Sequence, residues 1–231
     1  CDTLRLTFAF AAPTPAAVFR RADILWLVFD SKAAIDPSAL NVQANIKRAS
    51  LKRGADGEQI LRIKLDRPRL ISAVADNATW TVTIADTMVR PPQPLAMLRN
   101  ATGPNRGNIA IPFEAPHAPH ELRDPEIGDR LVIITAEAPS RGFLKDQHFV
   151  ELRTLASSQG VIIQPVADDL VVKTTPDKIV VSRPRGLSLS ATTLAKDGVT
   201  SNLQDVSFDP QVWGFDHNSP FLPRQTELLN K

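Results

Sequence analysis

His117 and His120 are the residues of this chain whose type and spacing come nearest to a metal site. Imidazole nitrogens bind transition metals, and carboxylates follow closely at Glu121 and Asp124. On a helix, a spacing of three would bring both rings to one face. Pro119 lies between them and argues against a helix, so a further ligand would have to come from elsewhere. We therefore expect no bound metal and no other cofactor. If a metal does bind, His117 and His120 are the candidate ligands.

Acidic residues recur where strands are expected to end, at Asp30, Asp86 and 168–169. Aspartate is favoured at such places because its carboxylate bonds to the turn backbone. Glycoside hydrolysis would instead need two carboxylates about 5–10 Å apart in a cleft. The chain also has no Gly-x-Ser-x-Gly elbow and no Walker-type phosphate loop. We expect no catalytic residues. The enzyme alternative that stays open is a hydrolase whose catalytic groups would be these strand-end acids.

The charge balance excludes one class of partner. The chain has 27 basic and 25 acidic residues, a formal net charge of +2, and this is too small to favour nucleic acid. The densest basic stretch, 47–53, is interpreted as a solvated strand edge, with a phosphate-binding patch as the alternative. The candidate binding residues are Trp213, Arg20 and Arg21.

Cys1 is the single cysteine, so an internal disulfide framework and a multi-cysteine metal site are excluded. A chain beginning with cysteine is interpreted as a piece of a longer protein. The alternative is a processed lipoprotein, whose Cys1 thiol carries a lipid. We expect a membrane contact only in that second case.

Alternating and continuous apolar runs predict strands throughout. Residues 4–10 alternate with a period of two, which is typical of a half-buried strand. Residues 24–29 are almost wholly apolar, so we expect a central strand buried on both faces. A sequence pattern of one strand, a proline, a short strand and an apolar strand recurs along the chain. It predicts four units, near 4–57, 60–104, 108–158 and 161–191, each of three or four strands.

Two segments depart from this pattern. Apolar residues between 143 and 156 suit one helical face, so a short helix is predicted there. Residues 208–231 change character: an extended, aromatic segment leads into 224–231, which has helical propensity. We expect 1–207 to be the repeated β domain and 208–231 a linker and the start of a helical region.

All-β architecture is the predicted fold class, and two arrangements compete. Units of about 50 residues suit the blades of a propeller, which is the preferred arrangement. Alternatively, pairs of units could form tandem β-sandwiches. In either case we expect Trp26 and Trp80, which lie in predicted buried strands, to pack in the core.

The segment FRRADILWLVFD at 19–30 resembles AMIN modules, and IPFEAPHAPHELRDPEIGDRLVIITAEAP at 111–139 has a similar pattern. Residues 161–231 resemble the β-rich region that precedes tetratricopeptide repeats in some large bacterial envelope proteins. The first resemblance implies β-sandwich modules that bind peptidoglycan or position envelope machinery. The second implies C-terminal helical repeats in the intact protein. Neither implies catalytic residues.

These observations predict a non-enzymatic binding or scaffold domain in the bacterial periplasm or cell envelope. Its expected partner is an envelope protein or peptidoglycan. Two alternatives stay open: a carbohydrate-active or hydrolytic enzyme with its site at a central channel, and a structural spacer.

Overall fold

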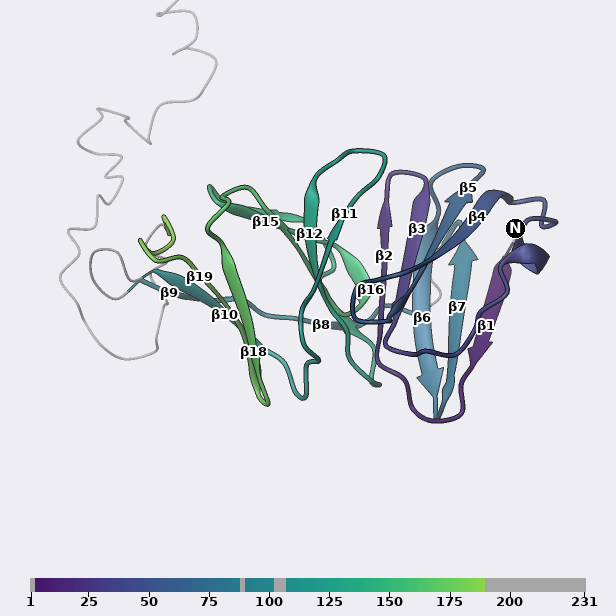
Figure 1. Cartoon of the computed structure of the whole chain (residues 1–231), viewed down its shortest axis with the longest axis horizontal. Helices are drawn as coiled ribbons and strands as arrows, with labels where there is room; N and C mark the ends of the chain where they lie inside the picture. Colours follow the sequence, from purple (N-terminus) through teal and green to yellow (C-terminus); the bar gives the residue numbers. More distant parts are fainter. Residues whose placement is uncertain (1–2, 88–89, 102–106, 190–231) are drawn as a thin grey trace, which may run out of the picture. The chain divides into compact units, whose positions relative to one another are not determined.

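The computed structural model describes residues 3–87, 90–101 and 107–189, and this part of the chain is all-β (Figure 1). Trp213, the expected linker at 208–231 and the predicted helical start lie outside the described residues. Within them, no helix is both long and apolar enough to cross a membrane.

The first half of the chain forms a β-sandwich. A three-stranded sheet in the order β1-β7-β6 packs on a five-stranded sheet in the order β16-β2-β3-β5-β4, and both contribute to one apolar core. The strands are β1 (Leu4–Ala9), β2 (Ala16–Arg21), β3 (Ile24–Phe29), β4 (Ile46–Arg53), β5 (Gln59–Leu65), β6 (Leu70–Asp76), β7 (Thr79–Ala85) and β16 (Ser157–Gln159). One 3-10 turn, η1 (Ser38–Leu40), precedes β4.

The second half forms another sandwich with its own core. A four-stranded sheet in the order β18-β19-β10-β9 packs on a five-stranded sheet in the order β11-β12-β17-β15-β14. The strands are β9 (Leu98–Asn100), β10 (Asn108–Pro112), β11 (His120–Arg123), β12 (Arg130–Ile134), β14 (Gln147–His148), β15 (Leu152–Leu155), β17 (Val161–Pro165), β18 (Val171–Thr175) and β19 (Lys178–Ser182). A short parallel pair joins β8 (Gln93–Pro94) to β13 (Arg141–Gly142).

The two sandwiches share one strand order. In the first, β1 pairs with β7 while β3 pairs with β5; in the second, β10 pairs with β19 while β12 pairs with β17. A propeller blade keeps the strands of one unit in a single sheet. Here the strands of each predicted unit are divided among two or more sheets, so the propeller arrangement is wrong, and the described strands form no closed ring. Paired sheets, the competing arrangement, are what the structure shows.

Strands with continuous apolar sequence lie between two cores, as expected for 24–29. All six residues of β3 are buried. Leu25, Leu27 and Phe29 face the core of the first sandwich. Ile24, Trp26 and Val28 face a separate apolar layer between the sandwiches. The predicted burial of Trp26 and Trp80 is likewise confirmed.

The helix predicted at 143–156 is wrong, because short strands occupy this segment. Leu152 packs in the second-sandwich core, whereas Leu155 packs in the layer between the sandwiches. Residues three apart in a strand point to opposite faces. A strand buried on both faces therefore carries apolar residues at a spacing that is also helical.

The layer between the sandwiches, called the junction below, is apolar. Sheet β16-β2-β3-β5-β4 meets sheet β11-β12-β17-β15-β14 through ten buried side chains. They are Ala17, Phe19, Ile24, Trp26, Val28 and Ile60 of the first sandwich, and Leu131, Ile133, Leu155 and Ile162 of the second. In addition, β16 follows β15 of the second sandwich but pairs with β2 of the first. Both features tie the sandwiches together.

We expect Trp80→Phe to lower the free energy of unfolding by about 1–3 kcal/mol. The buried Trp80 Nε1 donates a hydrogen bond of 2.7 Å to the carbonyl oxygen of Thr14, and phenylalanine would leave that oxygen unpaired. The matched control is Trp26→Phe, because the buried Trp26 Nε1 has no hydrogen-bond partner within the described residues. Urea denaturation of both variants measures the difference. An equal or larger loss in Trp26→Phe would contradict the prediction.

Candidate functional site

One of two polar clusters at the junction contains His120, a metal-ligand candidate. It is the first residue of β11 in the second sandwich. Asp30 directly follows β3 of the first sandwich, while Asp56 and Glu58 lie in the turn between β4 and β5. Gly57 in this turn has a φ of +90°, a left-handed conformation that glycine adopts without strain.

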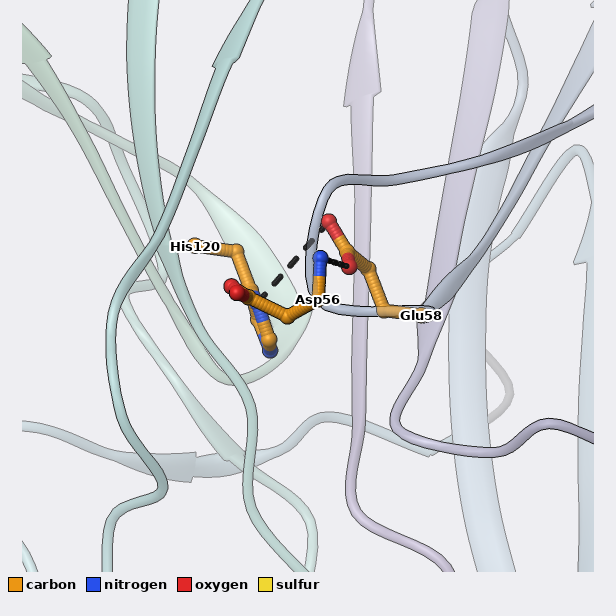
Figure 2. Close-up of side chains that lie close together, drawn as sticks. All are labelled: Asp56, Glu58 and His120. Carbon is orange, nitrogen blue, oxygen red and sulfur yellow. Dashed lines mark hydrogen bonds and ion pairs between the residues drawn. The ribbon is translucent and has the colours of Figure 1, made fainter.

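The imidazole of His120 lies between the carboxylate of Asp30 on one side and those of Asp56 and Glu58 on the other. Figure 2 shows the side with Asp56 and Glu58. Its Nε2 is 2.5 Å from Oδ1 of Asp30, and its Nδ1 is 3.2 Å from Oδ2 of Asp56 and 3.8 Å from Oε1 of Glu58. Thr135 donates its hydroxyl hydrogen to the other oxygen of Asp30. Asp56, Glu58 and His120 each offer one ligand atom, all within 4.8 Å of one another. The residues line a cavity of about 290 Å³.

Electrostatics in this cluster favour charged side chains. The close contact with Asp30 is the largest cause that raises the pKa of His120 to about 9; burial opposes it, and the charges of Asp30 and Glu58 add to it. For Asp30, burial works to raise the pKa, but hydrogen bonds with His120 and Thr135 outweigh it and hold that pKa below its usual value. At neutral pH the pair of His120 and Asp30 is therefore an imidazolium beside a carboxylate.

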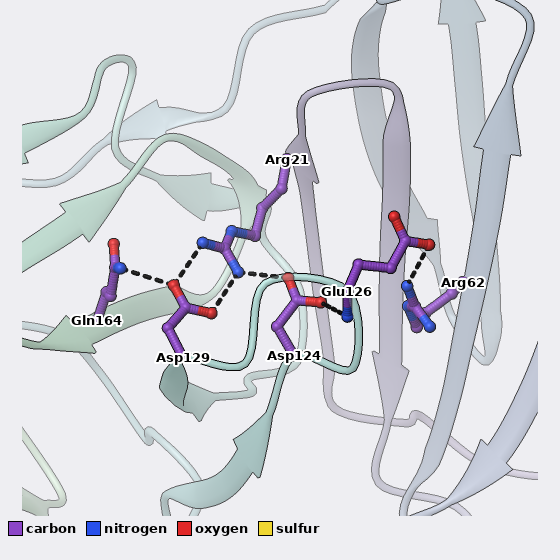
Figure 3. Close-up of polar contacts among 6 residues, drawn as sticks. All are labelled: Arg21, Arg62, Asp124, Glu126, Asp129 and Gln164. Atoms are coloured by element: carbon purple, nitrogen blue, oxygen red, sulfur yellow. Dashed lines mark hydrogen bonds and ion pairs between the residues drawn. The ribbon is translucent and has the colours of Figure 1, made fainter.

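The second cluster is centred on Arg21, at the end of β2 (Figure 3). Its guanidinium binds Asp129 through two hydrogen bonds, of 2.9 and 2.6 Å, and also donates to Asp124. Gln164 donates a further hydrogen bond of 2.6 Å to Asp129. Burial opposes the charged form, yet hydrogen bonding to Asp129 and both acidic charges raise the pKa of Arg21 above its ordinary value. Arg21 therefore links the first sandwich to the β11–β12 turn of the second.

A third contact lies beside the second cluster. The guanidinium of Arg62, on β5, stacks 4.7 Å from the Trp26 ring centroid and pairs with Glu126 at 2.9 Å. It extends the polar contacts across the junction toward β4.

The other candidate residues predicted from the sequence lie outside these two clusters or at their edge. His117 is half exposed and its Nδ1 lies 3.5 Å from Asp30, outside the three-ligand group. Glu121 pairs with Arg130. Asp86 pairs with Arg67 and Asp30 with His120, so each of these two acids has its own basic partner. Arg20 donates to the carbonyl oxygen of Ala22 in its own hairpin.

Asp56 and Glu58 were not among the candidate ligands predicted from the sequence. Both residues lie about sixty positions before His120, and no local spacing connects them. The available signal was the density of polar residues in a two-glycine turn that directly precedes β5, a strand of alternating apolar and basic residues.

Comparison with known proteins does not assign this chain to a family. No family model matches the chain, and neither the curated proteins nor the solved structures contain a match.

Proposed function

We propose that this chain is a non-enzymatic binding or scaffold domain of a bacterial cell-envelope protein, working in the periplasm and contacting peptidoglycan. Two tandem sandwiches with free edge strands suit such a role. The catalytic alternative required strand-end acids around a central channel, and the described strands form no ring. Its candidate acids Asp30 and Asp86 are each paired with a basic side chain.

The observation that carries this proposal is a basic face on β4 and β5. It consists of Arg48 and Lys52 on β4, and Arg62 and Lys64 on β5. Arg48 lies directly opposite Lys64, and Ser50 lies opposite Arg62. Like charges directly opposite each other on a sheet are destabilising, so their presence favours an anionic partner. A hollow of about 310 Å³ is lined by Arg48, Arg62 and Lys64 of this face and by Glu126.

Three cations of the basic face are available to such a partner. Arg48 and Lys52 are exposed and Lys64 is half exposed, and none has an acidic partner within the described residues. Arg62 is held over Trp26 and by Glu126. Peptidoglycan carries carboxylates on its peptide stems, which ammonium and guanidinium groups bind. The peptide stems thus match the chemistry of this face.

We expect the double variant Arg48→Glu/Lys64→Glu to bind purified sacculi about tenfold more weakly than the wild type, because two attractions become repulsions. Co-sedimentation at low and near-physiological salt measures it, and wild-type binding should fall with salt.

The matched control is Lys173→Glu/Lys178→Glu, which makes the same charge change on β18 and β19 of the second sandwich. Equal weakening of both double variants would contradict a specific basic face. No sedimentation of the wild type would contradict the proposed function and leave the structural spacer as the better hypothesis.

A further inference from the structure

We propose that Asp56, Glu58 and His120 bind a divalent transition-metal ion of the zinc class, and that this ion links the two sandwiches. The ligand set is one imidazole nitrogen and two carboxylate oxygens, which zinc binds in proteins. Two ligands come from the β4–β5 turn and the third from β11 of the other sandwich (Figure 2). This inference does not depend on the proposed function.

The ligand atoms already converge. His120 Nδ1 is 3.2 Å from an Asp56 oxygen and 3.8 Å from a Glu58 oxygen, distances compatible with neighbouring ligands around one ion. Bonds of about 2 Å to each ligand would require only small side-chain movements. The ion would take the place of the hydrogen on Nδ1.

The opposite side of the imidazole is arranged as in known metal sites. A ligating histidine commonly gives its other ring N–H to a carboxylate, which fixes the ring and raises its basicity. Asp30 occupies this position, 2.5 Å from Nε2, and is held in turn by the Thr135 hydroxyl. Asp30 is therefore a positioning residue that leaves Nδ1 facing Asp56 and Glu58.

Glu58 is held in place for this role. Its side chain is 3% exposed, and its Oε2 accepts a hydrogen bond of 3.0 Å from the backbone N–H of Asp56. A Cβ on Gly54 would lie 1.7 Å from Oε1 of Glu58, so the carboxylate occupies space that only glycine leaves. A buried carboxylate needs a cationic partner, and its nearest one is the imidazole at 3.8 Å. The turn is thus built around a carboxylate that faces the proposed ion.

The surroundings suit a zinc-class ion better than calcium or magnesium. Those hard cations prefer six or more oxygen ligands, whereas this group offers two carboxylates and a nitrogen. Three protein ligands leave one position of a tetrahedral site for water. Asp56 is 71% exposed on its side chain, so the ion can enter through the cavity described above.

Equilibrium dialysis against Zn²⁺ tests the site, in a Cys1→Ser background that removes the thiol as a competing ligand. We expect about one ion per chain and a rise in Tm of about 5 °C when free Zn²⁺ is hundredfold above Kd. Co²⁺ in place of zinc should give the visible absorption of a tetrahedral site with nitrogen and oxygen ligands.

Variants identify the ligands. Asp56→Asn changes an exposed side chain and should fold, yet weaken binding about 100-fold, while Asp30→Asn should weaken it about 10-fold or more. His148→Asn on the exposed strand β14 is the control and should bind like the parent. Failure of the parent to bind at about 100 μM Zn²⁺, or binding unchanged in Asp56→Asn, would overturn the proposal.

Discussion

Arg21→Met is expected to lower the free energy of unfolding by about 3–5 kcal/mol, because it leaves two junction carboxylates without their cation. Asp124 is only 2% exposed, and Arg21 is the cation that neutralises it across the junction. Methionine keeps much of the packing of the arginine side chain but none of its hydrogen bonds. The loss therefore comes from uncompensated buried charge rather than from a cavity.

Urea denaturation followed by circular dichroism measures this loss, and Arg130→Met is the matched control. Arg130 pairs with Glu121 at the same donor–acceptor distance, 2.9 Å, as one Arg21 bond, but those side chains are 31% and 61% exposed. Exposed pairs contribute about 0–1 kcal/mol, so the control should be nearly neutral. Similar losses in both variants would contradict the assigned role of Arg21.

A second substitution separates charge from geometry. Arg21→Lys keeps the positive charge but cannot make the paired hydrogen bonds to Asp129, so we expect an intermediate loss. Adding Asp124→Asn to Arg21→Met should recover part of the stability, because the remaining amide tolerates burial better than a carboxylate. No recovery in this double variant would indicate that the guanidinium acts mainly by packing.

Strand positions could be predicted from the sequence because each depends on its own residues. The alternation at 4–10 and the apolar run at 24–29 appear in the structure as β1 and β3. The partner of each strand could not be predicted in this way. A repeated unit of this length is compatible both with propeller blades and with sheets built from strands of several units. Which of the two architectures forms depends on long-range strand pairing, such as that of β1 with β7.

The side-chain contacts of the two polar clusters could likewise not be predicted from the sequence. His120 and Arg21 could be selected as chemically notable residues. Their partners could not, since Asp56 lies 64 residues from His120 and Asp124 lies 103 residues from Arg21. These contacts exist only because the outer faces of two sheets meet. The packing of these two sheets is driven by apolar residues such as Trp26. The burial of Trp26 could be predicted from the sequence, but the surface that covers it could not.

Trp26→Ala is expected to cost about 3–5 kcal/mol of unfolding free energy and to loosen the junction. The indole lies among the junction residues, stacked on Phe19 with ring centroids 5.7 Å apart and covered by the guanidinium of Arg62. Truncation would leave a cavity between two sheets rather than inside one sandwich. Both sandwiches should therefore become less protected.

Hydrogen exchange distinguishes this outcome from simple core damage, with Trp80→Ala as the control of equal size. Trp80 packs inside the first sandwich, so its truncation should leave amides of β12 and β17 protected. Trp26→Ala should expose those same strands, because Leu131, Ile133 and Ile162 lose the surface that covers them. If β12 and β17 stay equally protected in both variants, the junction does not stabilise the second sandwich, and if they exchange equally fast in both, the two sandwiches unfold as one cooperative unit. Faster exchange in Trp26→Ala alone would mean that the apolar junction directly stabilises the second sandwich, while the interior of each sandwich can open separately.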